Sequence, residues 1–273
     1  MRKVIDTNCL QSPTLREYLA KSAQNFAVLT DYAAMEAYKG DTLSSIYLSI
    51  DILAQHPKQV IVLKGTQIIC GMSGRSAGLQ RRLIDEGQTR GFTKYCEHLR
   101  AARSGDPSLQ RQILELGRDA TAHMDRLLSD AANLPVIFDE IAKTYTGTEL
   151  QILRTGRMTT ERMVGTFIRN ILLLAENFFK NHPRATKPPK VSELANTFIF
   201  RFALCAYLMA LRWIAAGGAA NARPAKIRND LVDVSFAAYG TYFDGLLTAD
   251  RKLNDIYKEA LLFLNTISAV ESA

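Results

Sequence analysis

The sequence is poor in the residues that build disulfide frameworks and zinc sites. Its 273 residues include four cysteines, at positions 9, 70, 96 and 205, and none of them has Cys-x-x-Cys spacing. The four histidines, at positions 56, 98, 123 and 182, are isolated from one another. We therefore expect a reduced, cytoplasmic protein without a zinc centre.

Sequence motifs for nucleotide binding are absent as well. Neither a Walker sequence nor Gly-x-Gly-x-x-Gly follows the first predicted strand, which argues against nucleotide hydrolysis and dinucleotide binding. Residues 74–78 match Gly-x-Ser-x-Gly, but helical sequence follows them. A nucleophile elbow needs a strand before it and further strands after it, so we interpret this segment as a turn or helix start.

The sequence has no long uninterrupted apolar run. Arg201 and Arg212 interrupt the apolar stretch 197–220 and leave ten residues between them. A membrane span needs about 20 apolar residues with few charges, so this stretch predicts a buried core helix and no membrane partner. The N-terminus lacks the apolar region of a secretory signal, so we do not expect secretion.

Apolar residues make up 47% of the chain, enough for one large domain or a domain with a substantial elaboration. Short apolar strands at 3–5, 25–29 and 59–63 alternate with helical segments at 13–23, 30–40 and 41–55. This alternation predicts a parallel sheet. The pattern is helical from 76 to 216, and a last helix–strand–helix run occupies 230–268.

The predicted fold class is therefore α/β, with a small parallel sheet formed by both ends of the chain. We expect residues 1–74 and 226–273 to form this sheet domain and 75–225 to form a large all-helical insertion. Formal charge divides in a similar way, with +10 between Arg75 and Arg228 and −3 in the two flanks. A basic helical block favours a polyanionic partner.

Four acidic residues far apart in the sequence fall near predicted strand ends or in the helices that follow: Asp6, Glu36, Asp230 and Asp250. Carboxylates at strand ends of an open α/β sheet converge on one edge. Such a cluster is costly unless a cation neutralises it, and hard oxygen ligands suit Mg²⁺ or Mn²⁺. The pattern indicates metal-assisted phosphodiester chemistry.

These motifs resemble those of the PIN-domain nucleases. Ile5-Asp6-Thr7-Asn8 resembles the family's opening motif, and Glu36 is in the place of its second acid. Asn229-Asp230, followed by small residues, resembles the third motif, and Leu247-Thr248-Ala249-Asp250 resembles the fourth. The resemblance covers about residues 1–65 and 226–265. It implies a PIN-type sheet with the helical insertion placed between the second and third acidic motifs.

The resemblance implies a metal-dependent endonuclease and favours RNA as the substrate, as for the toxins, processing enzymes and defence nucleases of this family. One or two Mg²⁺ or Mn²⁺ ions would be held by the four acids, with Asp233 as an alternative or additional third ligand. We favour Asp230 because Asn229 precedes it and because it is expected at a helix start. Asn8 and Thr248 would orient a carboxylate, a water or the phosphate.

The resemblance also implies partners. A toxin of this family would have an antitoxin or regulatory protein that covers the acidic edge, and PIN-like proteins often self-associate. Arg154, Arg157 and Arg162 would grip the phosphates of RNA if they share a face toward that edge. A solvated helix surface explains the same three arginines equally well.

Two other functions remain open from the sequence. Phosphatases of the haloacid-dehalogenase type also place an Asp after the first strand, but they have a second Asp two residues later, where this chain has Asn8. A non-catalytic PIN-like module that binds RNA or protein is the other alternative. The presence of all four acids argues against it.

Overall fold

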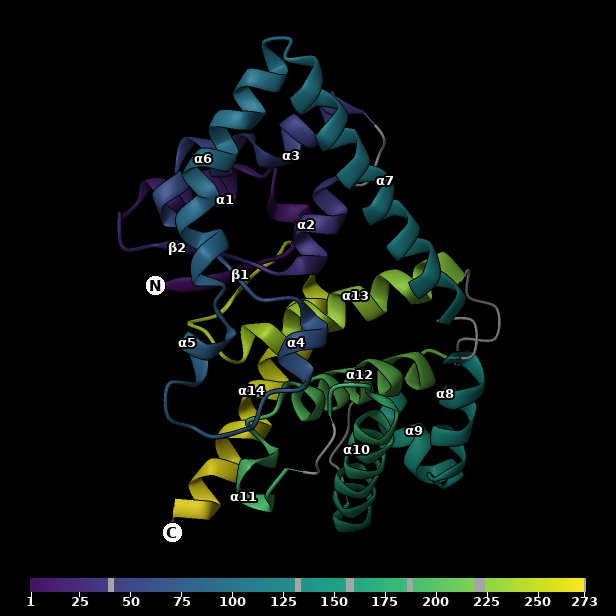
Figure 1. Cartoon of the computed structure of the whole chain (residues 1–273). Helices are drawn as coiled ribbons and strands as arrows, with labels where there is room; N and C mark the ends of the chain where they lie inside the picture. The colour runs from purple at the N-terminus through teal and green to yellow at the C-terminus, as the bar shows by residue number, and fades with distance from the viewer. Residues whose placement is uncertain (39–41, 131–133, 156–159, 186–188, 219–223, 273) are drawn as a thin grey trace. The chain divides into compact units, whose positions relative to one another are not determined.

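The computed structural model describes residues 1–38, 42–130, 134–155, 160–185, 189–218 and 224–272 (Figure 1). Four strands form one sheet in the order β3-β2-β1-β4, and every neighbouring pair is parallel. The predicted α/β class with a small parallel sheet is therefore confirmed. The strands are β1 (Arg2–Ile5), β2 (Phe26–Leu29), β3 (Val60–Val62) and β4 (Leu246–Leu247).

Helices make up most of the described chain. The helices that precede β3 are η1 (Thr7–Cys9), α1 (Pro13–Ala20), α2 (Asp31–Tyr38), α3 (Leu43–Gln55) and η2 (Pro57–Gln59). The following ones are α4 (Thr66–Cys70), α5 (Leu79–Leu83), α6 (Glu86–Arg103), α7 (Pro107–Asp130), α8 (Leu134–Lys143), α9 (Gly147–Thr155) and α10 (Glu161–Asn181). The last are α11 (Val191–Leu194), α12 (Phe198–Ala215), α13 (Pro224–Gly240) and α14 (Arg251–Ser272).

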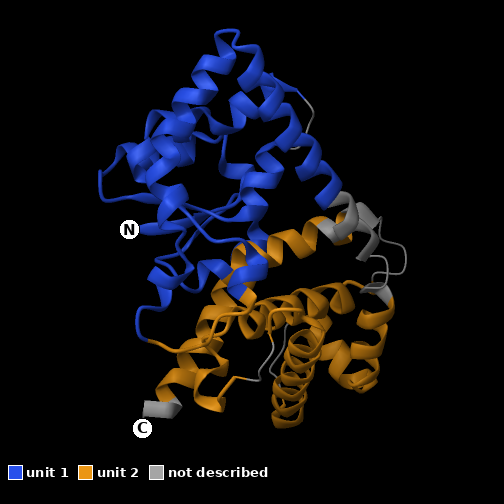
Figure 2. Cartoon of the chain, viewed as in Figure 1, with its two compact units in different colours: residues 1–69, 77–126, 239–254 blue, residues 70–76, 127–238, 255–273 orange. Residues whose placement is uncertain are grey.

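The chain forms two compact units that interleave along the sequence (Figure 2). The first unit contains residues 1–69, 77–126 and 239–254, and the second contains 70–76, 127–238 and 255–273. All four strands belong to the first unit. The division into a catalytic domain and a helical insertion at residues 75 and 225 stays a prediction.

The first unit has its core around the sheet. Val4, Ile5, Ala27 and Val28 are fully buried, as expected for parallel strands that are covered on both faces. Helix α6 packs against β3 and against α3. The strand order places β1 in the middle, because the crossovers from β1 to β2 to β3 run one way and β4 joins the other side of β1. This reversal makes β1 and β4 the topological switch point of the sheet.

The second unit has its core around α12, which packs against α8, α9 and α10. By length and composition α12 is apolar enough to cross a membrane, yet 67% of it is buried inside the protein. Its Tyr207 is fully buried and shares hydrogen bonds with the Tyr145 hydroxyl (2.7 Å) and the Asn170 amide (2.8 Å). The burial is that of the core helix expected from the sequence.

Candidate functional site

The carboxylate of Asp6 lies directly after β1, at the switch point of the sheet. Asp6 is 2% exposed, and its backbone N–H donates to the Leu247 carbonyl of β4 (3.0 Å). Its side chain caps the short helix η1 by accepting from the Asn8 N–H (3.5 Å). It also accepts from the Thr248 hydroxyl at 2.5 Å. The fold therefore holds this acid at the junction of β1 and β4.

The segment after β4 brings a second acid to the same junction. Thr248 donates to Asp6, and its hydroxyl oxygen accepts from the Asp250 N–H (3.0 Å). The Asp250 carboxylate caps α14 by accepting from the Leu253 N–H (3.1 Å). The Asn8 side-chain oxygen accepts from the Ala249 N–H (3.3 Å), which ties η1 to the same segment. Thr248 is thus the direct link between the two acidic positions.

Electrostatics at this junction disfavour the charge on Asp6. Burial raises the pKa of Asp6 above its ordinary value, and the nearby charge of Asp250 raises it further. The hydrogen bonds from Thr248 and from the Asn8 backbone act in the opposite direction, but the net pKa is still raised. Within the described part of the chain, neither acid forms an ion pair. Two carboxylates that interact without a basic partner favour a cation.

Glu36 of α2 is connected to this junction through Thr7. The Thr7 hydroxyl lies 2.5 Å from a Glu36 carboxylate oxygen and 3.5 Å from an Asp6 oxygen. Thr7 therefore bridges the acid after β1 and the acid in the helix after β2. Sequence reasoning assigned no role to Thr7, and its only signal was its place in the motif directly after Asp6.

Sequence reasoning also assigned no functional role to Asp31. Asp31 follows β2, and its carboxylate accepts from the Thr66 N–H and the Thr66 hydroxyl, both at 2.6 Å. The Thr66 hydroxyl also shares a hydrogen bond with the Tyr239 hydroxyl (2.8 Å). Asp31 thus joins the segments that follow β2 and β3. Because its carboxylate receives these donors, we assign it to the support of the sheet edge.

The candidate third acids, Asp230 and Asp233, belong to α13 and to the second unit. Asp230 is 5% exposed and accepts a hydrogen bond from the Trp213 indole N–H (2.8 Å). The expectation that Asp230 starts its helix is wrong, because α13 begins six residues earlier, at Pro224. Proline is favoured in the first helical turn, where its missing N–H costs nothing. The preference for Asp230 over Asp233 therefore rests only on the preceding Asn229.

The three arginines proposed to bind phosphate have different surroundings. Arg162 forms an ion pair with the buried Glu149, and its guanidinium also donates to the Thr144 carbonyl (3.4 Å). Arg154 is exposed near the end of α9. Arg157 lies outside the described residues. Of the two described arginines, Arg162 has a structural role within the second unit.

Among the described residues, no group of three or more His, Cys, Asp or Glu side chains is arranged to hold a metal ion. The first unit instead presents a pair, Asp6 and Asp250, with Glu36 linked to Asp6 through Thr7. Carboxylate oxygens of this kind are the donors that Mg²⁺ and Mn²⁺ prefer. The ligand set given by the sequence motifs stays a prediction.

Comparisons with known proteins add no relative. No family model matches the chain, and neither a curated protein nor a solved structure does.

Proposed function

We propose that the protein is a metal-dependent endonuclease of the PIN-like type that hydrolyses phosphodiester bonds in RNA. The observation that carries the proposal is the buried Asp6 carboxylate, whose charge is disfavoured by burial and by Asp250. Perturbed acids in a fold are concentrated at functional sites, because catalysis and metal binding need them there. The strand-end position of Asp6 agrees with the four-motif resemblance.

The location at the sheet edge supports the same conclusion. In open α/β sheets, ligands bind outside the carboxyl ends of the strands where the strand order reverses. In this chain that position falls between β1 and β4, and it is where Asp6 and Asp250 lie. By contrast, Asp244 precedes β4 and accepts from the Arg2 N–H (2.7 Å) at the amino end of the sheet. Asp6 and Asp250 therefore share the end of the sheet opposite to Asp244.

The proposed ligands within the first unit are Asp6, Glu36 and Asp250, and Asp230 or Asp233 of the second unit stays the third acid that the sequence motifs predict. Bound Mg²⁺ or Mn²⁺ would polarise the scissile phosphate and lower the pKa of an attacking water. Thr248 and Thr7 would fix the Asp6 and Glu36 carboxylates through the hydrogen bonds described above. Asn8 would hold the segment between β4 and α14 in place.

RNA as the substrate is supported by charge and by the resemblance. The segment between Arg75 and Arg228 has a formal charge of +10, and neutralisation of backbone phosphates supplies most of the non-specific affinity for nucleic acid. We propose that this segment is a helical insertion in the PIN-like sheet domain. Its exposed basic side chains, such as Arg154, would contact the phosphates.

The test is cleavage of a mixed-sequence RNA, the matching DNA and a small phosphoester by the full chain in Mg²⁺ or Mn²⁺. RNA cleavage is expected to require the metal and to fail in Asp6→Asn and Asp230→Asn. The matched control is Asp244→Asn, which removes an acid from the other end of β4 and should leave cleavage intact. Cleavage by a folded Asp6→Asn variant would refute the site. Hydrolysis of the small phosphoester alone would indicate a phosphatase.

A further inference from the structure

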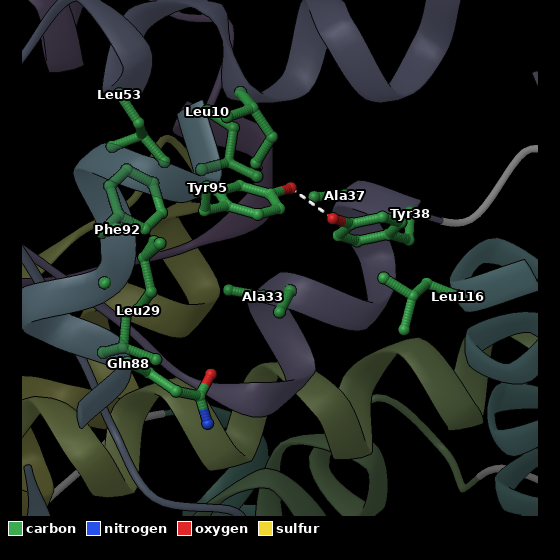
Figure 3. Close-up of a pocket in the computed structure, with 14 residues that line it drawn as sticks. Leu10, Leu29, Ala33, Ala37, Tyr38, Leu53, Gln88, Phe92, Tyr95 and Leu116 are labelled. Atoms are coloured by element: carbon green, nitrogen blue, oxygen red, sulfur yellow. Dashed lines mark hydrogen bonds between the residues drawn. The ribbon is translucent and has the colours of Figure 1, made fainter. Parts of the chain in front are cut away.

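The first unit contains an apolar cavity of about 410 Å³ that the proposed nuclease chemistry does not use. Its walls come from β2, β3, α2, α3, α6 and α7, and they include Leu29, Ala33, Leu53 and Phe92 (Figure 3). Protein interiors contain few voids larger than a water molecule. A cavity of this volume instead falls within the range of small-molecule binding pockets.

The cavity is open to solvent on one side. Four of its lining residues, Ala34, Gln88, Gly91 and Leu116, are exposed, whereas Ala33 and Leu53 are buried. A Cβ atom added at Gly91 would meet no atom within 4 Å, so the protein leaves this part of the wall open. A ligand therefore has both an entrance and a buried interior to occupy.

Besides the exposed Gln88, the cavity lining has one further polar feature. Tyr38 and Tyr95 point their hydroxyl groups toward each other and form a hydrogen bond (Figure 3). Burial raises the pKa of both tyrosines, so both hydroxyls keep their protons at neutral pH. A pair of hydroxyls uses one proton in its mutual bond, and the second proton can be donated to an acceptor.

The chemistry of the lining limits the ligand. None of the lining residues, all within the described chain, carries a charge, so an ionic ligand would lose its hydration without compensation. An apolar cavity of about 150 Å³ holds one benzene molecule, so this larger one suits a molecule about two to three times that size. We propose that the cavity binds a neutral, largely apolar small molecule whose hydrogen-bond acceptor pairs with the Tyr38–Tyr95 hydroxyls.

The site borders the proposed catalytic edge without sharing its residues. In α2, Glu36 lies three residues after Ala33, on the same helix face, and directly precedes Ala37, so it adjoins two cavity residues. Leu10, another lining residue, directly follows η1, which carries Thr7. The binding proposal stands on the cavity alone, and it does not depend on nuclease activity.

The test compares benzophenone with diphenylmethane, which has nearly the same shape but lacks the carbonyl acceptor. We expect saturable calorimetric binding of both to the full chain, with benzophenone tighter by about fivefold, the value of one net hydrogen bond. On irradiation, benzophenone should cross-link to peptides from α2 or α6. Absence of saturable binding, or cross-links only outside the lining, would overturn the proposal.

Two variants separate the cavity from non-specific adsorption. Ala33→Leu should fill the interior and abolish binding, whereas Ala101→Leu, at an exposed position of α6 outside the lining, should bind like the unmodified protein. The double variant Tyr38→Phe and Tyr95→Phe keeps the shape and should remove the preference for benzophenone. Unchanged binding in folded Ala33→Leu, or a preference that survives the double variant, would contradict the assignment.

Discussion

Two buried acids, one in each unit, have pKa values that their surroundings shift in opposite directions. Asp6 is 2% exposed and Glu149 is 5% exposed. Glu149 accepts from the Thr146 N–H (2.8 Å) and hydroxyl (3.0 Å) and forms an ion pair with Arg162. These contacts, the Thr146 N–H first, hold the pKa of Glu149 below its ordinary value. Asp6 has neutral donors and an acidic neighbour, and its pKa is raised.

The comparison distinguishes an acid whose buried charge is compensated from one whose charge is not. A buried charge is costly unless it is paired and hydrogen-bonded, and the second unit supplies both kinds of partner to Glu149. The first unit supplies only hydrogen bonds to Asp6, and it places Asp250 nearby. Proteins keep such uncompensated acids chiefly where a ligand or a reaction requires them. The missing compensation at Asp6 is the physical reason to expect a cation there.

The largest expected effect is on catalysis. We expect RNA cleavage to depend on Asp250, the acid beside Asp6, and not on Glu149. Asp250→Asn removes a charge while keeping a side chain that caps α14, and we expect it to reduce metal-dependent RNA cleavage at least about 100-fold. Glu149→Gln should leave cleavage within about twofold, since its charge serves the second unit. Initial rates at saturating Mg²⁺ measure both. Equal losses in the two variants would remove the distinction.

The next effect is on stability at the compensated acid. The folded pKa of Glu149 lies below 4.5, so its contacts stabilise the protein above pH 4.5 and are lost as pH falls through the folded value. Glu149→Gln should therefore lower Tm by several degrees at pH 7, with a smaller difference in acid. Thermal melts from pH 7 downward measure this. Glu140→Gln, which removes an exposed partner of Lys143, is the control and should change little.

At Asp6, the uncompensated acid, the pH dependence of stability has the opposite sign. The folded pKa of Asp6 lies above 3.8, so the folded state binds more protons, and stability falls as pH rises through the folded value. Asp6→Asn should therefore raise Tm at pH 7 in the presence of a chelator. The gain should shrink as pH approaches 3.8. A lower Tm for Asp6→Asn at neutral pH would show that its charge is already compensated.

The smallest effects concern the two threonines that hold the acids. Thr248→Val removes the donor to buried Asp6 and should lower the free energy of unfolding by about 1–2 kcal/mol in urea titrations. Thr7→Val removes the link to the less buried Glu36 and should cost less than about 1 kcal/mol. If Glu36 belongs to the site, Thr7→Val should still reduce cleavage. Unchanged cleavage would leave Glu36 as a surface residue of α2.

Much of the sheet and its edge could be predicted from the sequence because both follow local rules. The run 59–63 is short and rich in β-branched residues, which favours a buried strand over a helix, and a carboxylate directly after such a strand falls at the strand end. This reasoning places Asp6 correctly after β1. It also recognises α12 as a core helix, because arginines interrupt its apolar run.

The remaining features depend on contacts between segments that are distant in the sequence. Thr7 meets Glu36 across 29 positions, and Asp31 meets Thr66 across 35, so neither pair has a local signature. The ion pair between Arg162 and Glu149 joins residues 13 positions apart, so the sequence alone does not reveal that Arg162 has a structural partner. The sequence gives no signal for the cavity either, because small residues such as Ala33 are as consistent with close packing as with an open space.

The most direct measurement is the change in Tm on adding Mn²⁺ to the full chain and to three variants. Stabilisation by a ligand requires binding to the folded state, so the unmodified protein and Asp244→Asn should gain stability as Mn²⁺ increases. Asp6→Asn and Asp250→Asn should show no such gain. An equal gain in all four proteins, or none in the unmodified protein, would contradict a cation site at Asp6 and Asp250.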